Sequence, residues 1–115
     1  MYQFPYAEIA QEDMRAARRR EREAFDEVIT RLAAGKQNGP LSRETAEALF
    51  YLDRFWKILM DDLAHAGNGL PDALKANLLS IGIWMLNEVE AVRFKRASSL
   101  DALIDINRLV RDGLK

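Results

Sequence analysis

Apolar residues recur along the chain at helical spacing, in segments separated by glycine and proline. The stretches 35–40 and 67–71 combine Gly, Asn and Pro, and a weaker break follows at 97–99. No internal repeat or domain linker interrupts the pattern. The breaks predict four helices, over about 11–34, 42–66 and 71–95, and from 98 to a stop at Gly113.

Residues at the ends of these segments support the boundaries. Ser42 is a good N-cap, and Pro71 favours the first position of a helix. Ser98 and Asp101 have the spacing of a capping box, and Gly113 is a typical helix stop. Each predicted helix after the first therefore has a local start signal.

The second segment carries an apolar stripe centred on Trp56. Its members are Leu49, Leu52, Trp56, Leu59 and Leu63. We expect Trp56 to be buried, because aromatic side chains dominate protein cores. Tyr51, Phe55 and Ile58 lie off the stripe, and they widen the apolar surface beyond what one neighbouring helix would cover.

The third segment is apolar around most of its circumference, which predicts the central helix of the fold. Its main stripe comprises Leu74, Leu78, Ile81, Met85, Val89 and Val92, and a second row comprises Leu79, Ile83 and Leu86. The remaining strip comprises Ala73, Asn77, Ser80, Trp84, Asn87, Glu88 and Ala91. Trp84 stands among small and polar residues, so we expect it at a surface.

The first segment changes character along its length. Its second half has an apolar face, formed by Phe25, Val28, Ile29 and Leu32. In its first half the same stripe meets Arg18, Glu21 and Arg22. That half cannot bury a full face, so we expect it to project from the bundle.

Before this helix, Tyr2, Phe4 and Tyr6 alternate as they would in an extended segment, and Pro5 favours that form. Three aromatic side chains rarely stay exposed without a reason. They either fold back onto the bundle or cover part of a partner's groove. The chain, residues 1–115, is thus predicted to be one all-α domain, four-helix bundle-like, with a short extended aromatic N-terminal leader.

Composition and charge narrow the class of protein. Hydrophobic residues make up 49% of the chain and charged residues 30%, which is typical of a globular domain. A net charge of −1 gives no general attraction for nucleic acid or anionic membranes. The longest apolar stretch, 76–86, is too short to span a bilayer, and no secretory signal opens the chain. The absence of cysteine agrees with a reducing compartment.

Few residues could support catalysis. The one histidine, His65, follows Asp62 at a spacing that metal sites use, but a metal site in a bundle needs a second such pair. With one histidine and no cysteine, no nucleophile and base can be paired in the usual ways. We therefore expect no enzyme activity, no cofactor and no metal, and we expect His65 to cap a helix or lie at the surface.

An arginine cluster is the sharpest charged feature: Arg15, Arg18, Arg19, Arg20 and Arg22. It could bind RNA or an acidic partner. Acidic residues are interleaved with it at helical pairing distances, however, and they offset most of its field. We favour a solvated helix face and do not expect RNA to be a direct ligand.

Several stretches together carry a family resemblance. They are the leader 1–6, the stretch 70–84 ending in Gly82-Ile83-Trp84, the end 104–107 with 111–115, and shorter matches at 39–40, 42–43 and 47–49. On these residues the chain resembles the FlaF family of flagellar biosynthesis regulators over nearly its whole length. One departure is 53–56, Asp-Arg-Phe-Trp, where the family tends to have basic residues and Leu before Trp.

The resemblance implies a cytoplasmic protein of alphaproteobacterial type that binds unexported flagellin as a secretion chaperone. It also implies a role in flagellin synthesis and a functional link to the translational regulator FlbT. One alternative is an RNA-binding post-transcriptional regulator of flagellin mRNA that acts with FlbT through the arginine cluster. Another is a structural adaptor between regulators.

The family assigns no binding residues, so candidates come from the residue pattern. Flagellin termini are amphipathic helices, and a helix-in-groove mode would shield their apolar faces. The residues we expect to contact the partner are Tyr2, Phe4, Tyr6, Tyr51, Ile58, Asn77, Ser80, Trp84 and Asn87.

Overall fold

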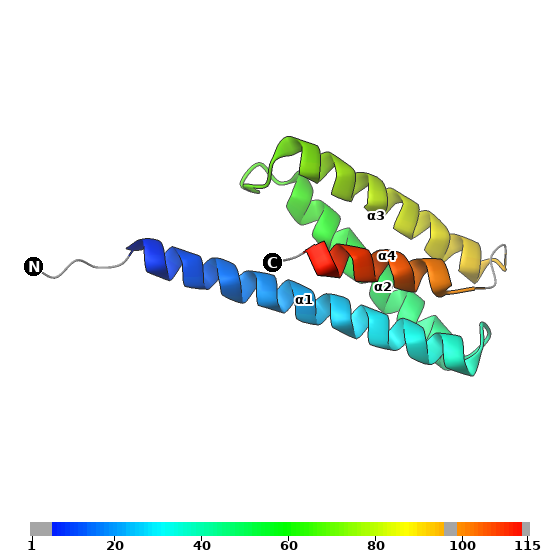
Figure 1. Cartoon of the computed structure of the whole chain (residues 1–115). Coiled ribbons are helices and arrows are strands. Elements are labelled where there is room, and N and C mark those ends of the chain that lie inside the picture. Colours follow the sequence, from blue (N-terminus) through cyan, green and yellow to red (C-terminus); the bar gives the residue numbers. More distant parts are fainter. Residues whose placement is uncertain (1–5, 96–98, 114–115) are drawn as a thin grey trace, which may run out of the picture.

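The computed structural model describes residues 6–95 and 99–113, with side chains described from residue 15 onward. Within these residues the chain forms helices and no strand, which confirms the all-α, four-helix prediction. Figure 1 shows the helices, which are α1 (Tyr6–Asn38), α2 (Arg43–Ala64), α3 (Asp72–Arg93) and α4 (Asp101–Gly113).

Local signals set the helix starts to within a few residues. The Ser42 hydroxyl accepts a hydrogen bond from the Thr45 backbone N–H at 3.1 Å, so Ser42 caps α2 as predicted. Pro71 has an extended ψ of 143° and is the N-cap of α3, so that helix begins one residue later than predicted. For α4, the Ser99 hydroxyl accepts from the Asp101 N–H at 3.1 Å, while Ser98 lies outside the described residues.

A compact turn joins α1 to α2. Gly39 adopts a positive φ of 101°, which side chains disfavour, and it ends α1. Its carbonyl accepts hydrogen bonds from the hydroxyls of Ser42 (2.7 Å) and Thr45 (2.8 Å). The turn therefore fixes the relative position of the two helices that form most of the core.

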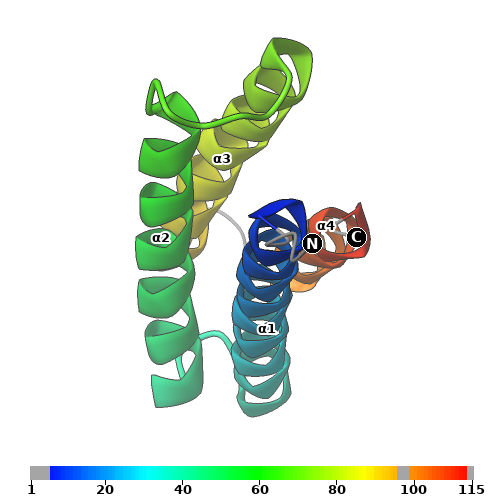
Figure 2. The same ribbon diagram turned by 90° about the vertical axis from the view of Figure 1, so that its left-hand side faces the viewer.

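Extensive contacts join α3 to α2, α2 to α1, and α1 to α4. Figure 2 shows α4 on the far side of α1 from α2. The prediction that α3 is the central helix is wrong: α2 lies between α1 and α3, and α1 lies between α2 and α4. An apolar circumference shows how much surface a helix could bury, but not how many neighbours the fold supplies. Ile83, in the second row of α3, is 57% exposed as a result.

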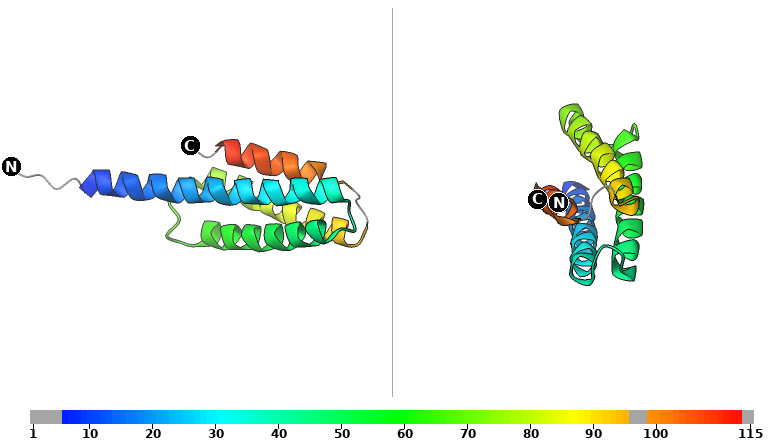
Figure 3. Two further views of the ribbon diagram at one scale, coloured as in Figure 1. Left: turned by 90° about the horizontal axis from the view of Figure 1, so that it is seen from below. Right: turned by 90° about the vertical axis from the view of Figure 1, so that its right-hand side faces the viewer.

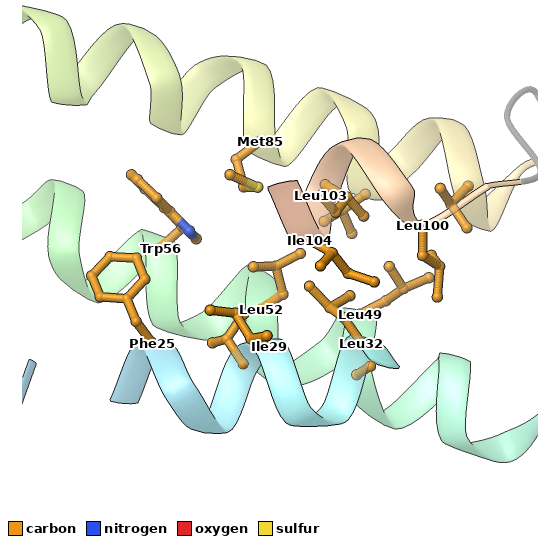
Figure 4. Packing of buried hydrophobic residues seen from close by; sticks show 14 residues of the cluster. Phe25, Ile29, Leu32, Leu49, Leu52, Trp56, Met85, Leu100, Leu103 and Ile104 are labelled. Atoms are coloured by element: carbon orange, nitrogen blue, oxygen red, sulfur yellow. The ribbon is translucent and has the colours of Figure 1, made fainter. Parts of the chain in front are cut away.

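All four helices contribute to one core (Figure 4). Trp56 is completely buried, as predicted, and its ring packs edge-on against Phe25 at 5.9 Å between centroids. Phe55 packs edge-on against Phe25 at 4.8 Å. These aromatic contacts join α1 and α2 at the middle of the bundle.

Asn107 is a fully buried polar residue of α4 that the hydrophobic pattern does not reveal. Its side-chain oxygen accepts a hydrogen bond from the Trp56 indole N–H at 3.0 Å. Its amide nitrogen donates to the Leu103 carbonyl at 2.7 Å and contacts the Met85 sulfur at 3.4 Å. One side chain therefore links α4 to both α2 and α3.

The first half of α1 projects beyond the other helices, as predicted (Figures 1 and 3). The helix begins at Tyr6, five residues before the predicted start. The extended leader therefore cannot include Tyr6, because a helical backbone replaces the predicted alternation there. Tyr2 and Phe4 lie outside the described residues.

Candidate protein-interaction surface

The main apolar stripe of α3 becomes steadily less buried toward the start of the helix. Met85, Val89 and Val92 are buried in the second half. Leu78 and Ile81 are half-buried, and Leu74 is 43% exposed. The first half of this stripe, Leu74, Leu78 and Ile81, is called the open stripe below. It has the periodicity of a core face but lacks a full set of neighbours.

The tilt of α3 relative to α4 explains this gradient. Figures 1 and 2 show that the end of α3 lies near the start of α4, and that the two helices separate toward the start of α3. On α4, Ile106 and Val110 are half-buried and Leu109 is exposed. The core of the bundle is thus covered at one end of α3 and incompletely covered at the other.

Trp84 lies at a partly exposed position beside the open stripe. It follows Ile81 by three residues, one turn along α3, and is 37% exposed. Its polar neighbours Asn77, Ser80 and Asn87 are exposed, and Glu88 is half-buried. The predicted surface strip therefore exists, and it adjoins apolar side chains that the fold leaves open.

The predicted Tyr51–Ile58 side of α2 is separate from this surface. Tyr51 is half-buried, with the Arg31 guanidinium 4.6 Å from the centre of its ring, so α1 covers it. Ile58 is 61% exposed. Both residues lie on nearly the opposite side of α2 from Met60, where Gly82 of α3 packs. The structure therefore does not bring Tyr51 and Ile58 together with Trp84.

Tyr2 and Phe4 lie outside the described residues, and Tyr6 is described only as the first residue of α1.

The arginine-rich part of α1 is exposed at Arg15, Arg18, Arg19, Arg20 and Arg22. The pattern of intrahelical pairing holds at Arg31, whose guanidinium contacts Glu27 at 2.8 Å. Asp26, which follows Arg22 by four residues, accepts instead from Arg111 of α4 at 2.9 Å. These contacts are typical of a solvated helix face with links to the neighbouring helix.

Glu21 lies where this part of α1 leaves the bundle. Its partial burial raises the pKa of its carboxyl, and the nearby Asp62 carboxylate raises it further, while Arg18 acts in the opposite direction. The charged form of Glu21 is therefore disfavoured by folding.

The histidine considered above as a metal ligand lies at the end of α2. His65 is the C-cap of α2, and its Nδ1 accepts a hydrogen bond from the Gly67 N–H at 3.1 Å. No group of three His, Cys, Asp or Glu side chains comes together as a metal site in residues 15–95 and 99–113. No helix in the described part of the chain is long and apolar enough to cross a bilayer.

Sequence comparisons give one family match. No curated protein and no solved structure shows significant similarity to the chain. The family model described as flagellar protein FlaF matches residues 2–114. This match covers nearly the whole chain, including all four helices and the open stripe, so the chain belongs to the FlaF family of flagellar proteins.

Proposed function

We propose that this chain is a flagellin-binding chaperone that holds an amphipathic terminal helix of flagellin in the cytoplasm before export. Membership of a flagellar family supports the pathway. The observation that carries the binding role is the partly exposed Trp84 beside the open stripe of Leu74, Leu78 and Ile81. A flagellin helix bound there would be kept from polymerising in the cytoplasm. The amount of flagellin bound to this chain would then be the signal that links export to the control of flagellin synthesis with FlbT.

The chemistry of this surface fits an amphipathic helix. Aliphatic side chains of the open stripe would receive the apolar face of the partner, and burying each one fully contributes about 1.5–3 kcal/mol. Trp84 at the edge would add a large rigid contact with an indole N–H, a combination favoured at binding hot spots. Asn77, Ser80 and Asn87 would then supply the polar rim around the apolar centre.

Binding of labelled flagellin terminal segments to the purified chain tests the proposal. We expect the Trp84→Ala variant to bind at least about 30-fold more weakly, because truncating an aromatic anchor costs about 2 kcal/mol or more. Phe50→Ala is the matched control, since Phe50 is an exposed aromatic on α2 outside this surface. Ile58→Ala measures whether the other exposed side of α2 contributes.

Three results are informative. Loss of affinity confined to Trp84→Ala supports the proposed surface. Loss confined to Ile58→Ala keeps the function but moves the site to α2. If no terminal segment of flagellin binds the unmodified chain, the chaperone function itself is wrong.

A further inference from the structure

A second surface lies at the opposite end of α3. A cavity of about 450 Å³ opens where the turn between α1 and α2 meets the last residues of α3. Eighteen residues separate Leu74 from Val92, so about 27 Å of helix lie between the open stripe and this cavity. What binds here is therefore independent of the function proposed for the open stripe.

The interior of the cavity is apolar. Leu49 and Val92 are buried core residues that form part of its lining, and Leu41 is 79% exposed beside them. The hydroxyls of Ser42 and Thr45 also line it, but both donate to the Gly39 carbonyl within the turn. Because those donors are already used, the lining favours an apolar group.

Two cations stand beside this apolar lining. Arg93 and Lys95 both line the cavity, and none of its lining residues is acidic. Arg93 contacts Glu90 at 3.1 Å, and Lys95 makes no salt bridge within the part of the chain that the structure describes. The start of α2 and the end of α3 meet here, so the opposite charges of their helix dipoles offset each other. Because Arg93 is paired with Glu90, the positive charge left at the cavity is mainly that of Lys95.

Lys95 is held in an unusual backbone conformation. Its φ of 61° lies in the left-handed region, where glycine is favoured, and its N–H donates to the Val92 carbonyl at 3.1 Å. A lysine at such a position costs the fold about 1 kcal/mol relative to glycine. A left-handed residue directly after the C-cap is a common way to end a helix, so this conformation fixes where Lys95 stands at the end of α3.

We propose that this cavity binds the C-terminal residue of a partner protein, when that residue has a bulky apolar side chain and a free α-carboxylate. Val92 and Arg93 are adjacent in sequence, and both line the cavity. A single ligand residue could therefore contact the apolar lining and a cation at the same time. A C-terminal leucine or phenylalanine carries both groups on the same α-carbon. Its side chain would enter beside Leu49 and Val92, and its carboxylate would meet Arg93 and Lys95.

Amide NMR spectra of the full chain, titrated with minimal probes, test this proposal. The probes are N-acetyl-leucine, its amide N-acetyl-leucinamide, and N-acetylglycine. We expect N-acetyl-leucine to shift amides of residues 39–49 and 92–95 and to bind about fivefold more tightly than its amide, as expected for an exposed charge pair. N-acetylglycine should bind much more weakly than either.

Variants assign the two parts of the ligand. Combined Arg93→Gln and Lys95→Gln substitutions should abolish the preference for N-acetyl-leucine over its amide. The control Arg54→Gln, at an exposed position of α2, should retain that preference. Ala46→Leu adds volume at an exposed lining residue and should abolish binding of both leucine probes. The dispersion of each variant's spectrum reports whether it remains folded.

Two longer probes distinguish a chain end from an internal acid. An octapeptide ending in leucine should bind with a free C-terminus and lose most of its affinity when amidated. Equal affinity for the two forms, or equal binding of a peptide with an internal Leu-Asp pair, would overturn the proposal, as would leucine-induced shifts that centre on Trp84 or are absent.

Discussion

Two tryptophans in adjacent helices occupy opposite environments. Trp56 is fully buried and hydrogen-bonded, whereas Trp84 is 37% exposed beside polar residues. We expect Trp56→Ala to lower the free energy of unfolding by about 3–5 kcal/mol, because it leaves a large cavity and removes the donor to Asn107. Trp84→Ala should cost about 1 kcal/mol.

Urea denaturation of both variants measures this difference. The folded fraction of Trp84→Ala must remain high for its binding data to be interpretable. If the two substitutions destabilise the protein equally, Trp84 belongs to the core and its assignment to a partner surface is wrong.

The buried hydrogen bond between Trp56 and Asn107 gives a second prediction at the residue scale. In Asn107→Leu the buried indole N–H loses its acceptor, so we expect a loss of about 1–3 kcal/mol in unfolding free energy. Replacing both partners, Asn107→Leu with Trp56→Phe, should cost at least about 1 kcal/mol less than the sum of the single changes. Additive losses in this double-mutant cycle would show that the bond contributes little.

At the scale of helices, two glycines mark close approaches of different kinds. A Cβ on Gly35 of α1 would lie 2.8 Å from the Thr45 hydroxyl oxygen and 3.0 Å from the Thr45 Cα of α2. A Cβ on Gly82 of α3 would meet the flexible end of Met60, at 2.5 Å from its sulfur. Displacing the backbone of a helix costs more free energy than moving a flexible methionine side chain.

We therefore expect Gly35→Ala to destabilise the protein by about 1–3 kcal/mol despite the better helix propensity of alanine. Gly82→Ala should be nearly neutral, because helix propensity offsets the displacement of Met60. Thermal unfolding of the two variants checks the contrast. A wild-type melting temperature for Gly35→Ala would mean that α1 and α2 can separate at little cost.

The contact between α1 and the end of α2 predicts a pH effect. Burial, followed by the Asp62 carboxylate, raises the pKa of Glu21 in the folded state, so ionised Glu21 opposes folding at neutral pH. Glu21→Gln should stabilise the protein near pH 7, by a few tenths of a kcal/mol at this half-exposed position. The penalty disappears once Glu21 is protonated in both states.

The advantage of Glu21→Gln should therefore shrink as the pH falls through the raised pKa of Glu21, and most of it should be lost by about pH 4, near the usual value of glutamate. Urea titrations of both proteins at the two pH values measure it. An advantage that is unchanged at low pH would mean that the carboxyl charge is not its cause.

At the scale of the whole molecule, charge separates the chaperone proposal from RNA binding. The net charge is −1, and the exposed arginines of α1 are interleaved with acids. We expect combined Arg18→Gln, Arg19→Gln and Arg22→Gln substitutions to leave the affinity for flagellin segments within about threefold of the original. The same variant should show no steep salt dependence of binding.

A filter-binding assay with flagellin leader RNA provides the contrasting measurement. Tight binding that weakens steeply with salt, and further with each arginine removed, would favour the RNA-binding alternative.

The sequence by itself determined the helices, most of their ends and the burial of Trp56. These features depend on local chemistry: Ser42 caps α2 through its own hydroxyl, and apolar side chains at helical spacing select one face. The projecting first half of α1 followed from the same reasoning, because arginine and glutamate replace the apolar stripe there.

Only the tertiary structure decided which faces find neighbours. The apolar circumference of α3 predicted a central helix, but α3 packs extensively against α2 alone, and its tilt away from α4 opens the stripe near Leu74. Asn107 becomes a core residue because Trp56, 51 positions away, supplies a donor. Tyr51 is covered and Ile58 is exposed for a similar reason. The burial of a side chain depends on which residues another helix places opposite it, and the spacing of apolar residues within one helix does not reveal those residues.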